Sequence, residues 1–115
     1  MKSEVKSVDV STRGTKFFIE RDGKQVARAF LYILYNELHS QPFGFLEDVF
    51  VLPELRNKGY GVSVVRMAIA CAKEQGCYKL IATSRHGRTK HHELCVKAGF
   101  KDHGVEFRMD FPTSA

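Results

Sequence analysis

The sequence lacks the run of about 18 apolar residues that a helix needs to cross a membrane. Its N-terminus carries no apolar stretch typical of a secretory signal. It has 3 cysteines, an odd number, without Cys-x-x-Cys spacing. There are no internal repeats and no low-complexity linkers. We therefore expect no membrane partner, no disulfide framework and a reducing, cytoplasmic location.

The composition predicts one folded domain. Of 115 residues, 43% are hydrophobic, which suffices for one packed core and is too little for two domains. The 27% charged and 11% aromatic residues exclude disordered, collagen-like and coiled-coil chains. We expect the domain at 15–111, after a loosely held segment or short strand at 1–14 and before a tail at 112–115.

Charge is unevenly distributed along the chain. Residues 1–55 hold 7 basic and 8 acidic side chains, whereas residues 56–115 hold 11 basic and 5 acidic ones, together with four of the five histidines. The second half should therefore attract an anion. Nucleic acid, an acidic membrane surface and a polyphosphate cofactor all fit this pattern, and a solvated basic face is the simpler alternative.

Three strands are expected in the first half. Residues 16–20 and 25–36 are rich in β-branched and aromatic side chains, and the Asp22-Gly23 pair between them is typical of a hairpin turn. A third strand, 43–52, ends at a proline that cannot donate to a ladder. Strict alternation would place Phe45, Glu47, Val49 and Val51 on one face of this strand and Leu46, Asp48, Phe50 and Leu52 on the other.

The second half alternates helices and strands. Apolar residues at helical spacing predict a helix at 62–75, with Gly76 as its stop. The next strand, 78–83, should run parallel to the third because the helix provides the crossover. A shorter helix at 89–98 and a final alternating strand at 105–111 complete the order.

The loop before the long helix has the features of a phosphate cradle. Gly59 and Gly61 leave the backbone bare where the helix begins, so N–H groups can point outward at the positive end of its dipole. Arg56 and Lys58 add two cations, and no acidic residue lies between Arg56 and Arg66. A P-loop GxxxxGK[ST] occurs nowhere, and the GxGxxG fingerprint fails because Val64 stands at the third glycine. A plain glycine turn is the alternative.

Two segments carry a family resemblance. The stretch EDVFVLPELRNKGYG, with its Arg-x-x-Gly-x-Gly loop, resembles motif A of the GNAT superfamily of N-acetyltransferases. The stretch HHELCVKAGF, residues 91–100, is similar to motif B of the same family and follows after one further strand. The resemblance covers residues 16–111 and departs in one respect, because only about fifteen residues precede the first expected strand, where the family usually has a helical pair.

The resemblance implies the fold, the cofactor and the reaction. We expect an α/β fold: a mixed, mostly antiparallel sheet with a central parallel strand pair splayed around the cofactor, and two main helices. The reaction would be direct acetyl transfer from acetyl-coenzyme A to a small-molecule or protein amine. Backbone groups of the third strand would pair with the cofactor, and the Val49 N–H would donate to the thioester oxygen. The implied cofactor-binding residues are Val49, Phe50, Val51, Arg56, Asn57, Lys58, Gly59, Tyr60, Gly61, Val62, Arg88 and His91.

The catalytic candidates are Glu47 and Cys95. The string Leu-Glu-Asp-x-Phe-Val resembles a strand of spermidine/spermine acetyltransferases, which implies Glu47 as a base that acts through water. The alternative is that Glu47 pairs with a basic neighbour or only binds the amine. Asp48 is the second candidate, since a carboxylate among apolar strand residues would have a raised pKa. Motif B usually carries a tyrosine where this chain has Cys95, so the thiol is either the general acid or a small buried apolar group.

Arg88 and His91 lie near the start of the second helix, where they either contact coenzyme A or form part of the helix surface. No metal site is expected, because adjacent histidines such as His91 and His92 point about 100° apart on a helix.

Two other functions stay open. A non-catalytic acyl-coenzyme A binding or regulatory domain would explain Cys95 and the missing helical pair. A basic nucleic-acid-binding module is disfavoured because the second half lacks aromatic residues interleaved with basic ones on a strand face. The partners expected are acetyl-coenzyme A and an amine, and the chain could form a homodimer.

Overall fold

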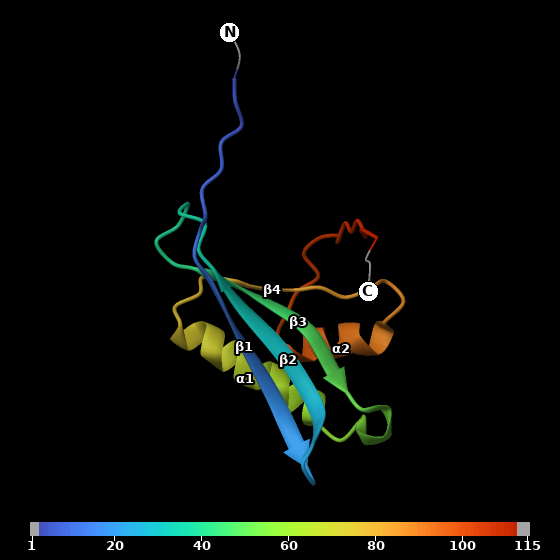
Figure 1. Cartoon of the computed structure of the whole chain (residues 1–115). Helices are drawn as coiled ribbons and strands as arrows, with labels where there is room; N and C mark the ends of the chain where they lie inside the picture. The colour runs from blue at the N-terminus through green and yellow to red at the C-terminus, as the bar shows by residue number, and fades with distance from the viewer. Residues whose placement is uncertain (1–2, 113–115) are drawn as a thin grey trace.

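A four-stranded sheet in the order β1-β2-β3-β4 forms the framework of the computed structural model, which describes residues 3–112 (Figure 1). The first three strands are antiparallel, and β3 pairs in parallel with β4. The elements are β1 (Thr12–Arg21), β2 (Lys24–Leu34), β3 (Phe43–Val51), the 3₁₀ turn η1 (Pro53–Leu55), α1 (Tyr60–Glu74), β4 (Leu80–Ala82) and α2 (Thr89–Ala98).

The hairpin of β1 and β2 forms as the Asp-Gly pair predicts. Asp22 and Gly23 have φ angles of 53° and 75°, the two positive values that a type I′ turn requires. This turn matches the twist of the flanking strands, so Arg21 pairs directly with Lys24 and the ladder continues to Thr12 opposite Leu34. β1 begins four residues before the expected 16–20 and ends one residue after it. β2 begins one residue before the expected 25–36 and ends two residues before its expected end.

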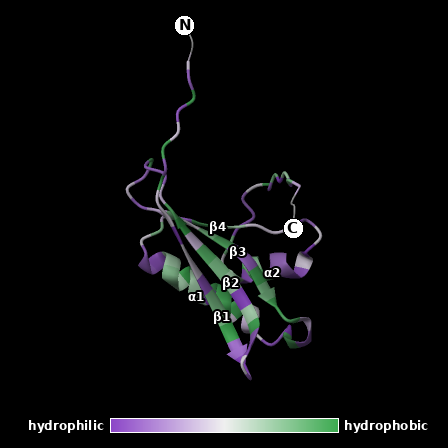
Figure 2. Ribbon diagram, viewed as in Figure 1, coloured by the Kyte–Doolittle hydropathy of each residue, from purple (hydrophilic) through white to green (hydrophobic). Residues whose placement is uncertain are grey.

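Helix α1 covers one face of the sheet. Its buried side chains Val64, Val65, Ala68 and Ala72 pack against alternate residues of β2, whose Leu31 is fully buried. Figure 2 shows this hydrophobic side of α1 turned toward the sheet. Gly76, with φ of 81°, ends the helix and returns the chain to β4.

Within residues 3–112 no helix is long and apolar enough to cross a membrane.

The opposite face of the sheet is open. In Figure 1 both helices lie behind the strands, and the face turned to the viewer is uncovered. Its aromatic side chains come from alternate positions of β1, β2 and β3. The rings of Phe30 and Tyr32 lie parallel with centroids 6.4 Å apart, and Lys16 lies 5.7 Å from the Phe30 ring. Gly14 permits this packing, because a Cβ there would lie 3.0 Å from the Tyr32 ring.

The final strand expected at 105–111 is not formed. Val105, Phe107, Met109 and Phe111 are all exposed, between 66% and 91%, and the segment has no strand partner. Alternation gives a strand only where a neighbouring edge supplies hydrogen bonds, and β4 has just three residues, all paired to β3. The parallel pair is therefore at the edge of the sheet among the described residues, and not central as expected.

The N-terminal residues precede the sheet, and most of the expected C-terminal tail lies outside the described residues. Residues 3–11 are exposed and extend away from the sheet, whereas β1 begins at Thr12, inside the segment expected to be loose (Figure 1). Of the expected tail 112–115, only Pro112 lies within the described residues.

Candidate active site

A β-bulge at Asp48 divides β3 into two parts. Leu46 stands opposite Leu31 and Glu47 opposite Phe30, but the next pair is Phe50 with Arg28, so Asp48 and Val49 together face one residue of β2. Asp48 has a φ of 53°, the left-handed conformation that a bulge residue often takes. The alternation of side chains is therefore inverted beyond Asp48.

The bulge corrects the predicted faces. Val49 and Val51 pack against the core under α1, whereas Glu47 lies on the open face beside its partner Phe30. Glu47 does not share a face with Val49, because one extra residue breaks the period of two. Asp48 also lies on the open face, where both of its carboxylate oxygens accept hydrogen bonds from Arg28, at 3.1 and 3.3 Å.

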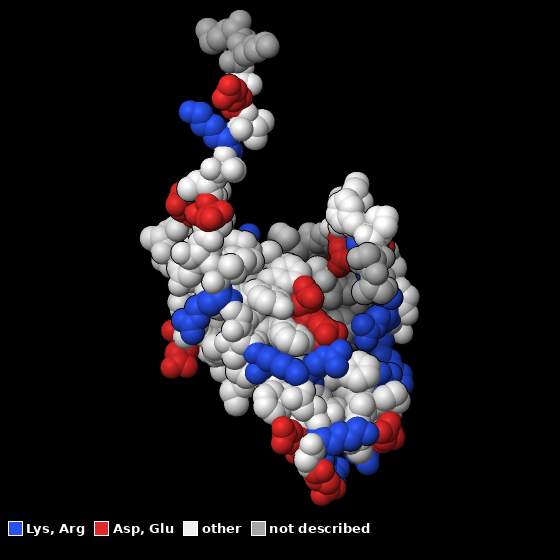
Figure 3. Space-filling model, in the orientation of Figure 1, with Lys and Arg blue, Asp and Glu red and all other residues white. Residues whose placement is uncertain are grey.

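The surroundings of the two carboxylates are polar. Both Glu47 and Asp48 are exposed, and the Arg28 guanidinium that holds Asp48 also lies 4.7 Å from the centre of the Phe50 ring. The apolar enclosure that the sequence predicted around these carboxylates is absent. In Figure 3 acidic and basic side chains lie next to one another near the middle of this otherwise mostly white face. Because Asp48 is already ion-paired, Glu47 is the freer of the two.

β3 and β4 separate where the bulge begins. The ladder joins Gly44 to Leu80 and ends at Leu46 with Ala82, whereas β3 continues to Val51. Over Glu47–Val51 the β4 side of β3 therefore has no strand partner in the described chain. A strand edge of this kind presents backbone N–H and C=O groups that a ligand can pair with. This is the splayed pair that the sequence predicted.

A cavity of about 560 Å³ lies beside this open edge. It brings five predicted site residues together: Glu47, Asp48, Val49, Arg88 and His91. Cys95, the predicted acid, is one helical turn beyond His91 and does not line the cavity described for residues 3–112. The lining residues are Phe45, Glu47, Asp48, Val49, Thr83, Ser84, Arg85, Arg88, His91, Glu106, Phe107 and Arg108.

The surroundings of α2 shift the pKa values of His91 and Cys95 in opposite directions. Burial lowers the pKa of His91, and the Arg88 guanidinium lowers it further, while a hydrogen bond with the Thr83 backbone opposes both. The His91 ring is therefore neutral at pH 7. Burial raises the pKa of the Cys95 thiol, which is thus fully protonated at the same pH.

The Arg56–Gly59 loop leads into a helix terminus with no side-chain cap. Gly59 is the N-cap residue, with φ of 87°, and no side chain bonds to the first N–H groups of α1. The first turn contains no acidic residue. Since the first N–H groups of a helix lack partners within it, they remain free to bind an anion. This geometry is compatible with the phosphate cradle, which stays a prediction.

The loop cations have different surroundings. Arg56 Nε donates to the Val51 carbonyl at 3.0 Å, and its guanidinium lies 5.6 Å from the Phe50 ring, so Arg56 ties the loop to the end of β3. Asn57, with φ of 65°, and Lys58 are exposed. The Tyr60 hydroxyl accepts a hydrogen bond from Arg21 at 3.0 Å.

Gly61 joins the loop to the rest of the site. A Cβ built on Gly61 would lie 3.5 Å from Val51 on β3 and 3.5 Å from Leu94 on α2, which is ordinary contact. Alanine would therefore fit, while a larger side chain would press on Val51 and Leu94. Val62 is partly buried behind this position. None of residues 56–62 lines the 560 Å³ cavity, so the loop and the cavity are separate parts of the site in the described chain.

Nothing in the sequence predicted that several of the residues lining the cavity belong to the site. Ser84 follows β4, and its Oγ is buried without a hydrogen-bond partner among the described residues. Glu106 and Arg108 come from the segment that was expected to be a strand. The alternation of that segment indicated a strand, and nothing in it indicated a cavity wall.

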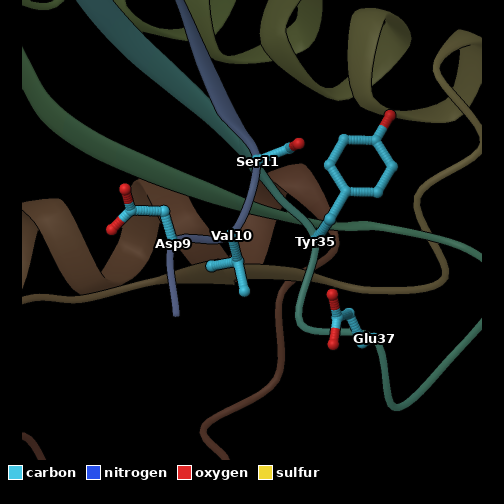
Figure 4. Close-up of a pocket in the computed structure, with 5 residues that line it drawn as sticks. All are labelled: Asp9, Val10, Ser11, Tyr35 and Glu37. Atoms are coloured by element: carbon cyan, nitrogen blue, oxygen red, sulfur yellow. The ribbon is translucent and has the colours of Figure 1, made fainter. Parts of the chain in front are cut away.

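A second hollow, of about 240 Å³, lies at the other end of the sheet and contains none of the predicted site residues. Figure 4 shows its lining, in which the Tyr35 ring and the carboxylates of Asp9 and Glu37 do not converge on one point. All its lining residues, Asp9, Val10, Ser11, Tyr35 and Glu37, are exposed, so it has the character of a surface depression.

Comparison with known proteins agrees with this geometry. Residues 4–100 match the model of the acetyltransferase (GNAT) family. The chain is 37% identical over 68 residues to a probable glucosamine 6-phosphate N-acetyltransferase 2 of Oryza sativa subsp. japonica, covering 59% of this chain and 39% of that protein. It is 32% identical over 82 residues to aminoglycoside N(6')-acetyltransferase type 1 of Stenotrophomonas maltophilia, covering 70% and 54%.

A solved structure matches over more of its length. The crystal structure of glucosamine-6-phosphate N-acetyltransferase from Arabidopsis thaliana superposes with a TM-score of 0.77 at 26% identity, covering 86% of this chain and 67% of that one. The chain spans between 39% and 54% of the length of the curated relatives it matches.

Proposed function

Because the chain belongs to the acetyltransferase (GNAT) family, we propose that it binds acetyl-coenzyme A and transfers the acetyl group directly to an amine. The observation that carries the proposal is the open edge of β3 beyond Leu46, which borders a cavity holding a carboxylate, a neutral imidazole and arginines. Such an edge can hold an extended ligand while the cavity receives the reacting groups.

The chain has a fitting site for the pyrophosphate of the donor. The uncapped terminus of α1 offers backbone N–H groups, and the exposed Lys58 beside it adds a positive charge. Gly61 brings this terminus close to Val51 of β3 and Leu94 of α2, each 3.5 Å from where a Cβ would lie. Bound acetyl-coenzyme A would supply an acyl carbon activated as a thioester.

Val49 is the proposed donor to the thioester oxygen. It lies at the bulge, on the unpaired stretch of β3, and lines the cavity. A fixed backbone N–H aimed at a developing negative charge lowers the barrier to acyl transfer. This role needs no particular side chain, which agrees with a valine at this position.

Glu47 is the proposed first base. It is exposed, projects from the open face and lines the cavity, so its carboxylate can attract an ammonium group and take its proton through water. The neighbouring aromatic rings of Phe30 and Phe45 also favour a cation. Asp48 is held by Arg28 and would serve to fix the bulge.

The acceptor proposed is a cationic amine, with amino sugars as the first class to test. The names of two relatives, a glucosamine 6-phosphate N-acetyltransferase and an aminoglycoside N(6')-acetyltransferase, motivate this choice. Glu47 would face the amine, and Arg85 is a cavity cation that suits an anionic substituent, whereas Arg108 is paired with Asp110 at 2.7 Å.

The test combines binding and turnover. Native mass spectrometry with acetyl-coenzyme A should detect a complex of one donor per chain. Thiol release should then be measured against glucosamine 6-phosphate, an aminoglycoside and a linear diamine. Turnover with at least one of them supports the proposal, whereas binding without turnover on any amine would favour a non-catalytic acyl-coenzyme A binding domain.

A further inference from the structure

Proton transfer to the leaving group has no assigned residue in this chain. Cys95 was the sequence candidate, but its thiol does not line the cavity among the described residues, and burial raises its pKa. His91 is one helical turn earlier on α2 and does line the cavity, together with Glu47 and Val49. The imidazole is therefore the titratable group of α2 that lines the cavity.

The His91 ring is in the right state to accept a proton. Its partial burial and the nearby Arg88 keep it neutral at pH 7, while the hydrogen bond with the Thr83 backbone holds the ring in place. A neutral imidazole can take up a proton on a free ring nitrogen and release it again, which neither a carboxylate nor a thiol does as readily near pH 7.

Charges of both signs surround the ring. Arg88 and His92 lower its basicity from its own helix. The charged groups that share the cavity with it from other elements are Glu47 and Asp48 of β3, Arg85 of the loop after β4, and Glu106 and Arg108 of the C-terminal segment. Asp48 is neutralised by Arg28, so Glu47 and Glu106 are the anions that could stabilise a charged ring.

We propose that His91 carries a proton from the amine nitrogen to the departing thiolate. This inference rests on the proposed acetyl transfer. An ammonium acceptor loses two protons in forming an amide, and the first passes through Glu47 to water. As the bond between nitrogen and carbonyl carbon forms, the second proton moves to the neutral His91 ring. As the C–S bond breaks, the charged ring gives this proton to sulfur and becomes neutral again.

The first experiment compares variants of histidines. His91→Gln should lower kcat for acetyl-coenzyme A by about a hundredfold, in the range typical of acid–base groups. His86→Gln is the matched control, because His86 is exposed in the same region and does not line the cavity described here. Imidazole added to His91→Ala should restore part of the lost rate. Wild-type turnover in His91→Gln would overturn the inference.

The second experiment changes the leaving group. A thioester of 4-nitrothiophenol releases a thiolate that needs no proton. With this donor, His91→Gln should lose clearly less activity than with acetyl-coenzyme A, because sulfur no longer needs a proton and only the uptake of the amine proton still depends on His91. An equal loss with both donors would mean that His91 gives no proton to sulfur, and the inference would be wrong.

The third measurement does not depend on turnover. NMR titration of the free protein should give His91 a pKa below its usual value, and added coenzyme A should shift the His91 ring signals. Ring signals that do not shift when coenzyme A is added would contradict the proposed placement of His91 at the reacting groups. If the wild type transfers acetyl to no amine, the proposed function fails and this inference with it, whereas an active wild type with an unimpaired His91→Gln defeats this inference alone.

Discussion

The two halves of β3 have the same strand geometry but opposite surroundings. Gly44–Leu46 is paired on both sides, with Leu46 only 3% exposed, while Glu47–Val51 is paired to β2 alone and borders the cavity. One residue, Asp48, separates them by adding a position to the strand. The comparison teaches that a strand can continue past a single bulge while its outer edge changes from paired to open.

The largest effect should come from Glu47→Gln in the open half. Turnover should fall by about 10²–10⁴-fold, roughly 2.7–5.4 kcal/mol of barrier, because the amide cannot accept a proton. Acetyl-coenzyme A affinity and unfolding free energy should stay near wild type, since the side chain is exposed. Steady-state kinetics across pH test this prediction, with the exposed Glu54→Gln as control. Full activity at every pH would remove Glu47 from the mechanism.

In the paired half, Leu46→Ala should act on stability. Removing a buried leucine side chain costs about 2–5 kcal/mol of unfolding free energy. Denaturant unfolding gives the value. Turnover per folded molecule should change little, and a specific loss of kcat in folded Leu46→Ala would show that the two halves are not separable.

Gly61→Val extends the comparison to the loop that packs on the end of β3. The extra methyl groups should press on Val51 and Leu94 and displace the N–H groups of the first turn of α1, so the Kd for acetyl-coenzyme A should rise at least tenfold, about 1.4 kcal/mol. Gly61→Ala is the matched control, because its Cβ would make contacts of 3.5 Å. Isothermal titration of both variants measures the difference. Equal affinities would exclude the cradle.

The ion pair at the junction should contribute less. Arg28 and Asp48 are both partly exposed, and exposed pairs contribute about 0–1 kcal/mol. A double-mutant cycle with Arg28→Met and Asp48→Asn should give a coupling energy below about 1 kcal/mol. A larger coupling would indicate that this pair is what maintains the bulge.

The smallest effect should be a pH dependence of stability beside the open half. Burial lowers the folded-state pKa of His91, so the unfolded chain binds its proton more readily. His91 therefore lowers the stability of the fold as pH falls below its unfolded pKa of about 6.5. Thermal unfolding of the wild type and His91→Gln should be measured between pH 5 and 8. The difference between their unfolding temperatures should change with pH at the lower end and become constant toward pH 8.

Local signals in the sequence were sufficient for the framework. The Asp22-Gly23 pair predicted the hairpin, apolar spacing predicted α1 to within two residues at its start, and the 89–98 helix has the expected bounds. Each depends on neighbours in the chain, whose preferences act within a few residues. The parallel pairing of β3 and β4 followed because the crossover helix leaves few alternatives.

The bulge and the C-terminal segment could not be predicted in the same way. Alternation gives the faces of a strand only if its period is unbroken, and nothing in Glu47-Asp48-Val49 indicates an inserted residue. Residues 105–111 alternate as well as β2 does, yet a strand also needs a partner edge. The meeting of His91 with Glu47 and Ser84 depends on the packing of three elements, which no spacing in the sequence encodes.

The tight turn at Asp22-Gly23 also has a consequence for the order of folding. Because β1 and β2 are joined by two residues, their ladder closes a very short loop, and hairpins of this kind form in about 1–10 μs. The β3–β4 ladder instead joins Gly44 to Leu80 and requires α1 to be in place. Distant pairings close more slowly than local ones. We therefore expect the hairpin to nucleate the domain and the split between β3 and β4 to be among the last parts to form.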